Sequence, residues 1–207
     1  MRASEEEISG LLRELGAWNS GHFLLSSGLH SNQYVQCQKI LQYPRHGLVL
    51  ADELARQVSE AGLRPTVVVG PALGAVHWEL LVAMALDRQA YQADRPIKAV
   101  FAERPEGKND FEIRRGIEIA SGEKVLVVED VTTTGGSARK VTELVRRLGG
   151  DPVAIGAIVD RSGASVDFGL PFFALVKLDL RTYSAAECLM CQAGMPLSKP
   201  GSSSSKR

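Results

Sequence analysis

The stretch that decides the fold is VLVVEDVTTTGGS, residues 125–137. Four apolar residues make a short run typical of a buried parallel strand, and two acids, Glu129 and Asp130, follow it directly. A turn rich in hydroxyl groups and glycine then leads into a helix predicted over 135–148. Ligands of open α/β sheets bind beyond the carboxyl ends of the strands. The segment therefore predicts a strand, a turn and a helix that together carry a binding site.

The same alternation of strands and helices continues on both sides of this segment. Short apolar, β-branched runs predict strands, and apolar residues at helical spacing predict helices. The strands are expected at 66–69, 98–101, 124–128, 153–159 and 172–176, and the helices at 44–61, 75–86, 135–148 and between Ser4 and Gly16. This order predicts an α/β fold with a doubly wound, mainly parallel sheet. Residues 20–43 show only short strand-like pieces, FLL and QYVQC.

Length and composition indicate one ordinary globular domain over residues 1–207, with a flexible tail at 198–207. Lysine plus arginine and aspartate plus glutamate number 24 each, so a basic excess for nucleic-acid binding is missing. No apolar run approaches the roughly 20 residues that span a bilayer. The acidic start does not read as a signal peptide, and three cysteines do not suggest a secreted scaffold. We expect a cytoplasmic protein without a membrane partner.

The turn that follows Glu129 and Asp130 has the residue types of an anion-binding site. Free N–H groups at a helix N-terminus and small residues suit a phosphate group. Glu129 and Asp130 can hold sugar hydroxyls directly or through a metal ion. A Walker-type phosphate loop would need a lysine, and the turn has none. The alternative is that the acids only cap the helix while the glycines form a turn.

This pattern resembles the signature of the type I phosphoribosyltransferase family. The resemblance implies that Glu129 and Asp130 contact the ribose of phosphoribosyl pyrophosphate, with Asp130 counted among the catalytic residues. It also implies that the turn binds the 5-phosphate of this substrate. The residues of that turn are Val131, Thr132, Thr133, Thr134, Gly135, Gly136 and Ser137.

The identity of the base is indicated by other segments. Residues 21–36, which include GHFLLSSGLHS, resemble the N-terminal part of orotate phosphoribosyltransferases. This resemblance implies that residues 1–43 form a hood over the base and that Ser26 and Tyr34 lie at the orotate pocket. Many members carry a lysine where Ser26 stands, so Ser26 is either a hydrogen-bond donor or an ordinary surface serine.

Two further residues are assigned to the base by the same resemblance. Arg161 matches an arginine that faces the orotate carboxylate, and a guanidinium fork suits a planar carboxylate. Thr133 matches the loop position that also touches the base.

The segment around Ala72, Leu73 and Gly74 resembles the loop that binds pyrophosphate through backbone N–H groups. An ordinary turn from strand to helix is the alternative there.

The polar segment 103–114 resembles the family's mobile catalytic loop, which closes over the site of a neighbouring subunit. The implied catalytic cations are Arg104 and Lys108. Pro105 and Asp110 stand where other members have a second lysine and a histidine, and Arg114 or Arg115 are candidates to compensate. The alternative is a solvated hairpin without a catalytic role.

The resemblance implies a Mg²⁺-dependent reaction of orotate with phosphoribosyl pyrophosphate, carried out by a homodimer. Mg²⁺ is expected to be held through the substrate pyrophosphate and ribose rather than by dedicated protein ligands. The products are orotidine 5′-phosphate and pyrophosphate. Two alternatives remain open: an enzyme of this fold that acts on a purine base, and a non-catalytic regulator that binds RNA. The neutral charge argues against the second.

The last motif is Cys188-Leu189-Met190-Cys191. A tetrahedral zinc site needs four ligands, and no second pair of cysteines or histidines follows downstream. We therefore expect Cys188 and Cys191 to have a packing role. The isolated histidines His22 and His30 receive no catalytic role.

Overall fold

The computed structural model describes residues 2–25, 27–89, 96–163 and 166–200. Its centre is a five-stranded sheet in the order β4-β3-β5-β6-β7. The strands are β3 (Val67–Pro71), β4 (Lys98–Ala102), β5 (Lys124–Thr132), β6 (Asp151–Asp160) and β7 (Phe172–Lys177). Every neighbouring pair is parallel. The predicted doubly wound parallel sheet is therefore confirmed.

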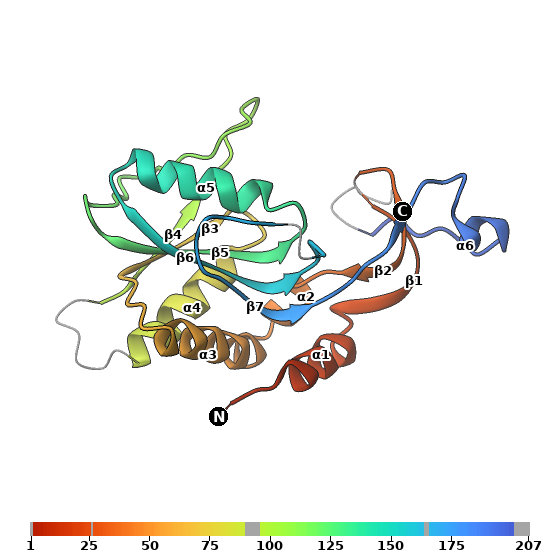
Figure 1. Cartoon of the computed structure of the whole chain (residues 1–207), viewed down its shortest axis with the longest axis horizontal. Helices are drawn as coiled ribbons and strands as arrows, with labels where there is room; N and C mark the ends of the chain where they lie inside the picture. Colours follow the sequence, from red (N-terminus) through yellow and green to blue (C-terminus); the bar gives the residue numbers. More distant parts are fainter. Residues whose placement is uncertain (1, 26, 90–95, 164–165, 201–207) are drawn as a thin grey trace.

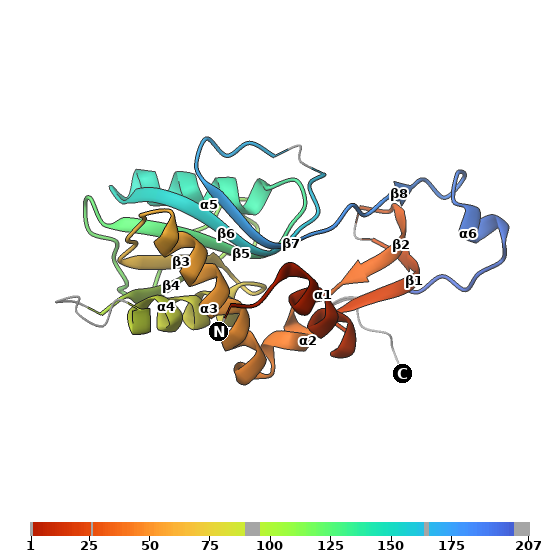
Figure 2. The ribbon, with the colours of Figure 1, turned by 60° about the horizontal axis from the view of Figure 1, so that its bottom comes forward.

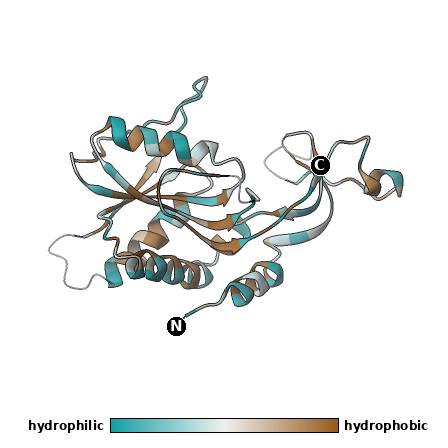
Figure 3. Cartoon of the chain, in the orientation of Figure 1, coloured by the Kyte–Doolittle hydropathy of each residue, from teal (hydrophilic) through white to brown (hydrophobic). Residues whose placement is uncertain are grey.

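Helices cover both faces of this sheet (Figure 2). One face is covered by α5 (Gly136–Arg147), and the other by α3 (Pro44–Glu60) and α4 (Val76–Gln89). The side chains of β3 alternate between the two layers, because Val67 and Val69 join the core beneath α5 whereas Val68 joins the core beneath α3 and α4. A strand that is buried on both sides needs an uninterrupted apolar sequence. Figure 3 shows this hydrophobic colour along the central strands.

The chain begins with α1 (Glu5–Glu14), which is capped as its sequence predicts. The Ser4 hydroxyl accepts a hydrogen bond from Glu7 N at 3.2 Å, and the Glu7 carboxylate accepts one from Ser4 N at 2.7 Å. This reciprocal capping box satisfies two backbone donors that the first helical turn leaves free. Ile8 and Leu12 bury the inner side of the helix.

A second, smaller sheet lies at the opposite end of the molecule from β4 (Figure 1). It is antiparallel and contains β1 (Trp18–Leu24), β2 (His30–Val35) and β8 (Thr182–Tyr183). The short helices α2 (Gln38–Leu41) and α6 (Leu189–Gln192) complete the described elements. The sequence does not predict β8 or α6. The small sheet thus combines the N-terminal hairpin with a strand from the C-terminal part of the chain.

The C-terminal segment contacts this hairpin as far as Ser198, although the sequence predicts a flexible tail from that residue onward. Ser198 N donates to the carbonyl of His22 at 2.8 Å, and Leu24 N donates to the carbonyl of Ser198 at 2.8 Å. Ser198, the first residue assigned from sequence to a flexible tail, is thereby paired with β1. Residues 201–207 fall outside the described ranges. In the described parts of the chain, no helix combines the length and the apolar character that crossing a bilayer requires.

Candidate active site

The turn after β5 encloses a small cavity of about 90 Å³. It is lined by the residues predicted for the phosphate, Val131, Thr132, Thr133, Thr134, Gly135, Gly136 and Ser137, together with Glu129. Gly135 has φ 73°, and a Cβ atom there would lie 2.7 Å from the Phe168 ring, so only glycine fits. The cavity opens at the start of α5, where backbone N–H groups and the helix dipole favour an anion.

The two acids stand at the carboxyl end of β5, beside this cavity. Burial and, to a smaller extent, the neighbouring charge of Asp130 raise the pKa of Glu129 to about 8, against a smaller lowering by Arg104. Burial also raises the pKa of Asp130, whose Oδ1 accepts a hydrogen bond from Val131 N at 2.8 Å. Adjacent, poorly solvated carboxylates gain from hydroxyl donors or a cation. This pair fits a sugar diphosphate that carries Mg²⁺.

A larger cleft of about 1420 Å³ extends from this turn toward the small sheet. The predicted residues among its lining are Tyr34, Leu73, Gly74, Thr133, Thr134 and Arg161. Ala72 immediately precedes this lining, and Ser26 lies outside the described residues. The base, pyrophosphate and phosphate segments named from sequence therefore meet around one space.

Arg161 enters this cleft from the end of β6. Its backbone N donates to the Thr132 carbonyl at 2.7 Å, which ties it to the phosphate turn. Among the described residues, its buried Nε has no hydrogen-bond partner. Burial lowers the pKa of Arg161, and the nearby Tyr34 partly offsets this effect, while burial raises the pKa of Tyr34. A desolvated guanidinium with a free donor is suited to a bound carboxylate.

The loop after β3 approaches the acids closely. A Cβ atom on Gly74 would lie 3.1 Å from Asp130 Oδ1, so glycine lets this backbone come near the carboxylate. Gln38 of α2 holds the loop, because its amide donates to the Gly74 carbonyl and its Oε1 lies 3.1 Å from His77 Nδ1. Gln38 and His77 both line the cleft. The sequence did not identify either residue, although His77 lies only one turn beyond the predicted loop.

The base of the same loop rests on a buried acid. Glu79 of α4 is 3% exposed, and its Oε2 accepts a hydrogen bond from Gly70 N at 3.1 Å. Burial raises the pKa of Glu79 to about 8, and the hydrogen bond from Gly70 offsets only part of that shift. A neutral, protonated carboxyl still accepts this bond. Glu79 therefore positions the start of the loop.

Replacing Glu79 with glutamine is expected to make the stability less dependent on pH. The folded-state pKa of Glu79 is raised from 4.5 to about 8, so the folded chain binds more protons than the unfolded chain between these values. The free energy of unfolding therefore falls as pH rises through this window. Because the glutamine amide does not titrate, the free energy of unfolding of the variant should exceed that of the wild type by roughly 2 kcal/mol or more at the upper end of this pH window.

Urea unfolding at a series of pH values measures this effect. Glu143→Gln, on the exposed side of α5, is the matched control and should keep the wild-type slope. Identical pH slopes for Glu79→Gln and the wild type would contradict the assignment.

The loop 103–114 forms a hairpin that projects beyond α5 (Figure 1). Arg104 stacks over the Phe111 ring at 4.6 Å, and Lys108 pairs with Glu112 at 2.6 Å. Neither predicted cation lines either cavity of its own chain. Arg114 and Arg115, named as candidates to compensate, both pair with Glu103 on the same hairpin. The positive charge of Arg104 is nevertheless close enough to lower the pKa of Glu129.

Lys199 is a further residue of the cleft wall that sequence reasoning missed. It was assigned to the tail because its surroundings are rich in serine, glycine and proline. The backbone bonds of Ser198 to β1 bring Lys199 and Pro200 to the cleft. Lys199 therefore adds a positively charged side chain to the wall of the cleft.

Comparison with known proteins agrees with this geometry. Residues 39–167 match the family described as the phosphoribosyl transferase domain. The chain is 48% identical over 198 residues to an orotate phosphoribosyltransferase of Caldanaerobacter subterraneus, covering 96% of this chain and 97% of that one. It is 44% identical to the Thermotoga maritima enzyme of the same name, over 94% of this chain and 97% of that one.

A solved structure supports the same relation. The Mycobacterium tuberculosis orotate phosphoribosyltransferase in complex with phosphoribosyl pyrophosphate is 26% identical, with a TM-score of 0.60 over 84% of this chain and 96% of that chain. The chain belongs to the phosphoribosyl transferase family and, within it, to the orotate phosphoribosyltransferases.

Proposed function

We propose that this protein transfers the phosphoribosyl group of phosphoribosyl pyrophosphate to orotate, forming orotidine 5′-phosphate and pyrophosphate in pyrimidine nucleotide synthesis in the cytoplasm. The observation that carries the proposal is the buried Nε of Arg161, which has no hydrogen-bond partner within the described part of the chain and lies in the cleft beside the phosphate turn. A purine base carries no carboxylate that would match this guanidinium. The relatives at 43–48% identity are named orotate phosphoribosyltransferases, which supports orotate as the base.

The two cavities accommodate the parts of the substrates in a definite order. The small cavity takes the 5-phosphate, and Glu129 and Asp130 take the ribose hydroxyls beside it. The loop at Ala72–Gly74, with His77 behind it, faces the pyrophosphate. Orotate then occupies the cleft between Arg161 and Tyr34, with Thr133 at its edge.

The chemical task is to stabilise a sugar that becomes positively charged at C1′ as pyrophosphate leaves. By analogy with glycoside cleavage, charge spreads over C1′ and the ring oxygen, so nearby carboxylates lower the barrier. Orotate is already an anion, and a strong general base is unnecessary. Mg²⁺, when bound with the diphosphate, supplies charge neutralisation for the leaving group. Arg161 orients the base, and the 70–75 loop binds the leaving group.

The catalytic hairpin is proposed to act on a neighbouring subunit of a homodimer. Neither Arg104 nor Lys108 lines either of the two cavities of its own chain, and closure of the hairpin over a neighbouring site would exclude water that otherwise hydrolyses the donor. Leu80 and Met84 of α4 are exposed, and so is Val49 of α3. Exposed apolar side chains of this kind are suited to a subunit contact.

A single assay tests the activity. Tag-free protein is mixed with phosphoribosyl pyrophosphate and Mg²⁺, and product nucleotide is measured with orotate, adenine or hypoxanthine as the base. Turnover with orotate alone is expected, and its loss on chelation of Mg²⁺ tests the cofactor. Turnover with adenine or hypoxanthine but not with orotate would indicate an enzyme of the same fold that acts on a purine base. Tight RNA binding without turnover would instead support the regulator.

A further inference from the structure

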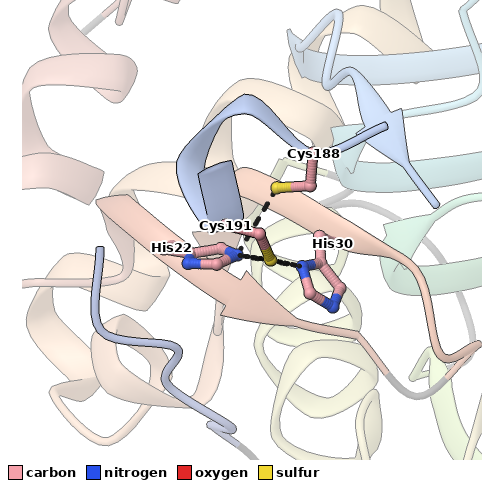
Figure 4. Close-up of side chains that lie close together, drawn as sticks. All are labelled: His22, His30, Cys188 and Cys191. Carbon is pink, nitrogen blue, oxygen red and sulfur yellow. Dashed lines mark hydrogen bonds between the residues drawn. The ribbon is translucent and has the colours of Figure 1, made fainter. Parts of the chain in front are cut away.

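Four potential metal ligands meet outside the cleft, in the small sheet (Figure 4). His22 comes from β1, His30 from β2, and Cys188 and Cys191 from the turn that carries α6. Their nearest nitrogen and sulfur atoms all lie within 4.8 Å of one another. The second ligand pair, which was sought downstream of the cysteines, lies upstream of them, more than 150 residues away in the chain.

The separations between these atoms are close to those of a tetrahedral zinc centre. Zn–N bonds of about 2.0 Å and Zn–S bonds of about 2.3 Å place tetrahedral ligand atoms roughly 3.3–3.8 Å apart. His22 Nε2 lies 2.9 Å from His30 Nδ1, and 3.5 and 3.6 Å from the sulfurs of Cys188 and Cys191. Cys191 Sγ lies 3.2 Å from His30 Nδ1. All four atoms lie within 4.8 Å of one another, so shifts between a few tenths of an ångström and about 1 Å would accommodate the ion.

The hydrogen bond on the outer side of the His22 ring leaves its other nitrogen available to a metal ion. Its Nδ1 lies 3.0 Å from the carbonyl oxygen of Met195, which can only accept, so Nδ1 carries the proton. In the neutral ring the Nε2 lone pair then faces the cluster. An outer hydrogen bond that fixes the tautomer is the usual arrangement around a zinc-bound histidine.

Burial and charge also favour Zn²⁺. His22, His30 and Cys188 are buried, with exposures of 4%, 5% and 0%, Cys191 is exposed, and both cysteines are free thiols. Two thiolates balance the charge of a divalent cation, so the buried centre would carry no net charge. Two sulfur and two imidazole ligands in a tetrahedral arrangement select zinc over the harder Mg²⁺.

We propose that His22, His30, Cys188 and Cys191 bind one structural Zn²⁺ ion that fastens the C-terminal segment to the N-terminal hairpin. The complete set of four protein ligands leaves no open position, which indicates a structural and not a catalytic ion. The ion would hold the segment that continues to Ser198 along β1 and to Lys199 at the cleft.

Elemental analysis of the full-length, tag-free protein tests this site. Close to one zinc per chain is expected after dialysis, and Cys188→Ser and Cys191→Ser should each reduce it to a small fraction. Cys37→Ser, at the remaining cysteine, is the matched control and should retain the ion. Wild-type protein that neither contains zinc nor takes it up on titration would overturn the proposal, as would equal zinc loss in the control.

Two measurements keep the test independent of how the variants fold. Reduced wild-type protein stripped of metal and titrated with Co²⁺ should develop the visible absorption of a tetrahedral, thiolate-bound ion. Chelation should also expose residues 184–200 to limited proteolysis while cleavage at 103–114 stays unchanged. A Co²⁺ spectrum without thiolate charge transfer, or a native Cys188–Cys191 disulfide found by mass spectrometry, would exclude the site.

Discussion

Arg161→Ala should lower kcat/KM for orotate by roughly 100-fold or more, because charge-assisted hydrogen bonds are worth about 1.5–3 kcal/mol each. The guanidinium is held at the cleft by the bond from its own backbone to Thr132, and its Nε lacks a partner among the described residues. An orotate carboxylate would satisfy that donor. Steady-state kinetics with each substrate varied in turn measures the effect, which should fall mainly on orotate.

Two companion variants separate recognition from general damage. Arg161→Lys keeps the charge but loses the planar fork, so it should recover only part of the lost efficiency. Arg146→Ala, in the exposed last turn of α5, should behave as the wild type. An unchanged KM and kcat for orotate in Arg161→Ala would show that Arg161 does not bind the base.

Asp130→Asn should reduce kcat by about 100-fold or more, as expected when a charged group that stabilises a transition state is neutralised. The pKa of Asp130 is raised by burial, so the folded chain bears a cost for keeping this carboxylate charged. Its substitution by a neutral amide of the same shape keeps an acceptor for Val131 N. The variant should therefore fold normally, with a free energy of unfolding at least equal to that of the wild type.

Combined kinetic and unfolding measurements check this expectation. Asp151→Asn, exposed at the other end of the sheet, serves as the control and should leave both quantities unchanged. Loss of activity together with loss of stability would point to a structural role for Asp130. Wild-type turnover would show that the strand end does not contact the sugar.

Local sequence was sufficient for the main sheet and for the phosphate turn. The apolar run 125–128, the two acids and the Gly135 turn are contiguous, and each step depends on neighbouring residues. Strand, turn and helix are set by short-range preferences, so the pattern predicted them together. The assignments of Tyr34 and Arg161 came from resemblance rather than from local physics, and the cleft brings both residues together.

The parts that sequence did not predict depend on contacts between distant segments. Strand β8 has only two residues and exists because it pairs with β2, and Lys199 reaches the cleft because Ser198 pairs with β1. Glu79 is polar by type, yet burial beneath the loop raises its pKa.

The amino-acid sequence was thus enough to predict the parallel α/β sheet and the turn after β5, and through resemblance it supplied the residues that we propose for the base. Tertiary structure alone decided that His22 and His30 face Cys188 and Cys191. The physical reason is that periodicity and turn chemistry act over a few residues, whereas ligand geometry and burial are set only when remote segments are folded together.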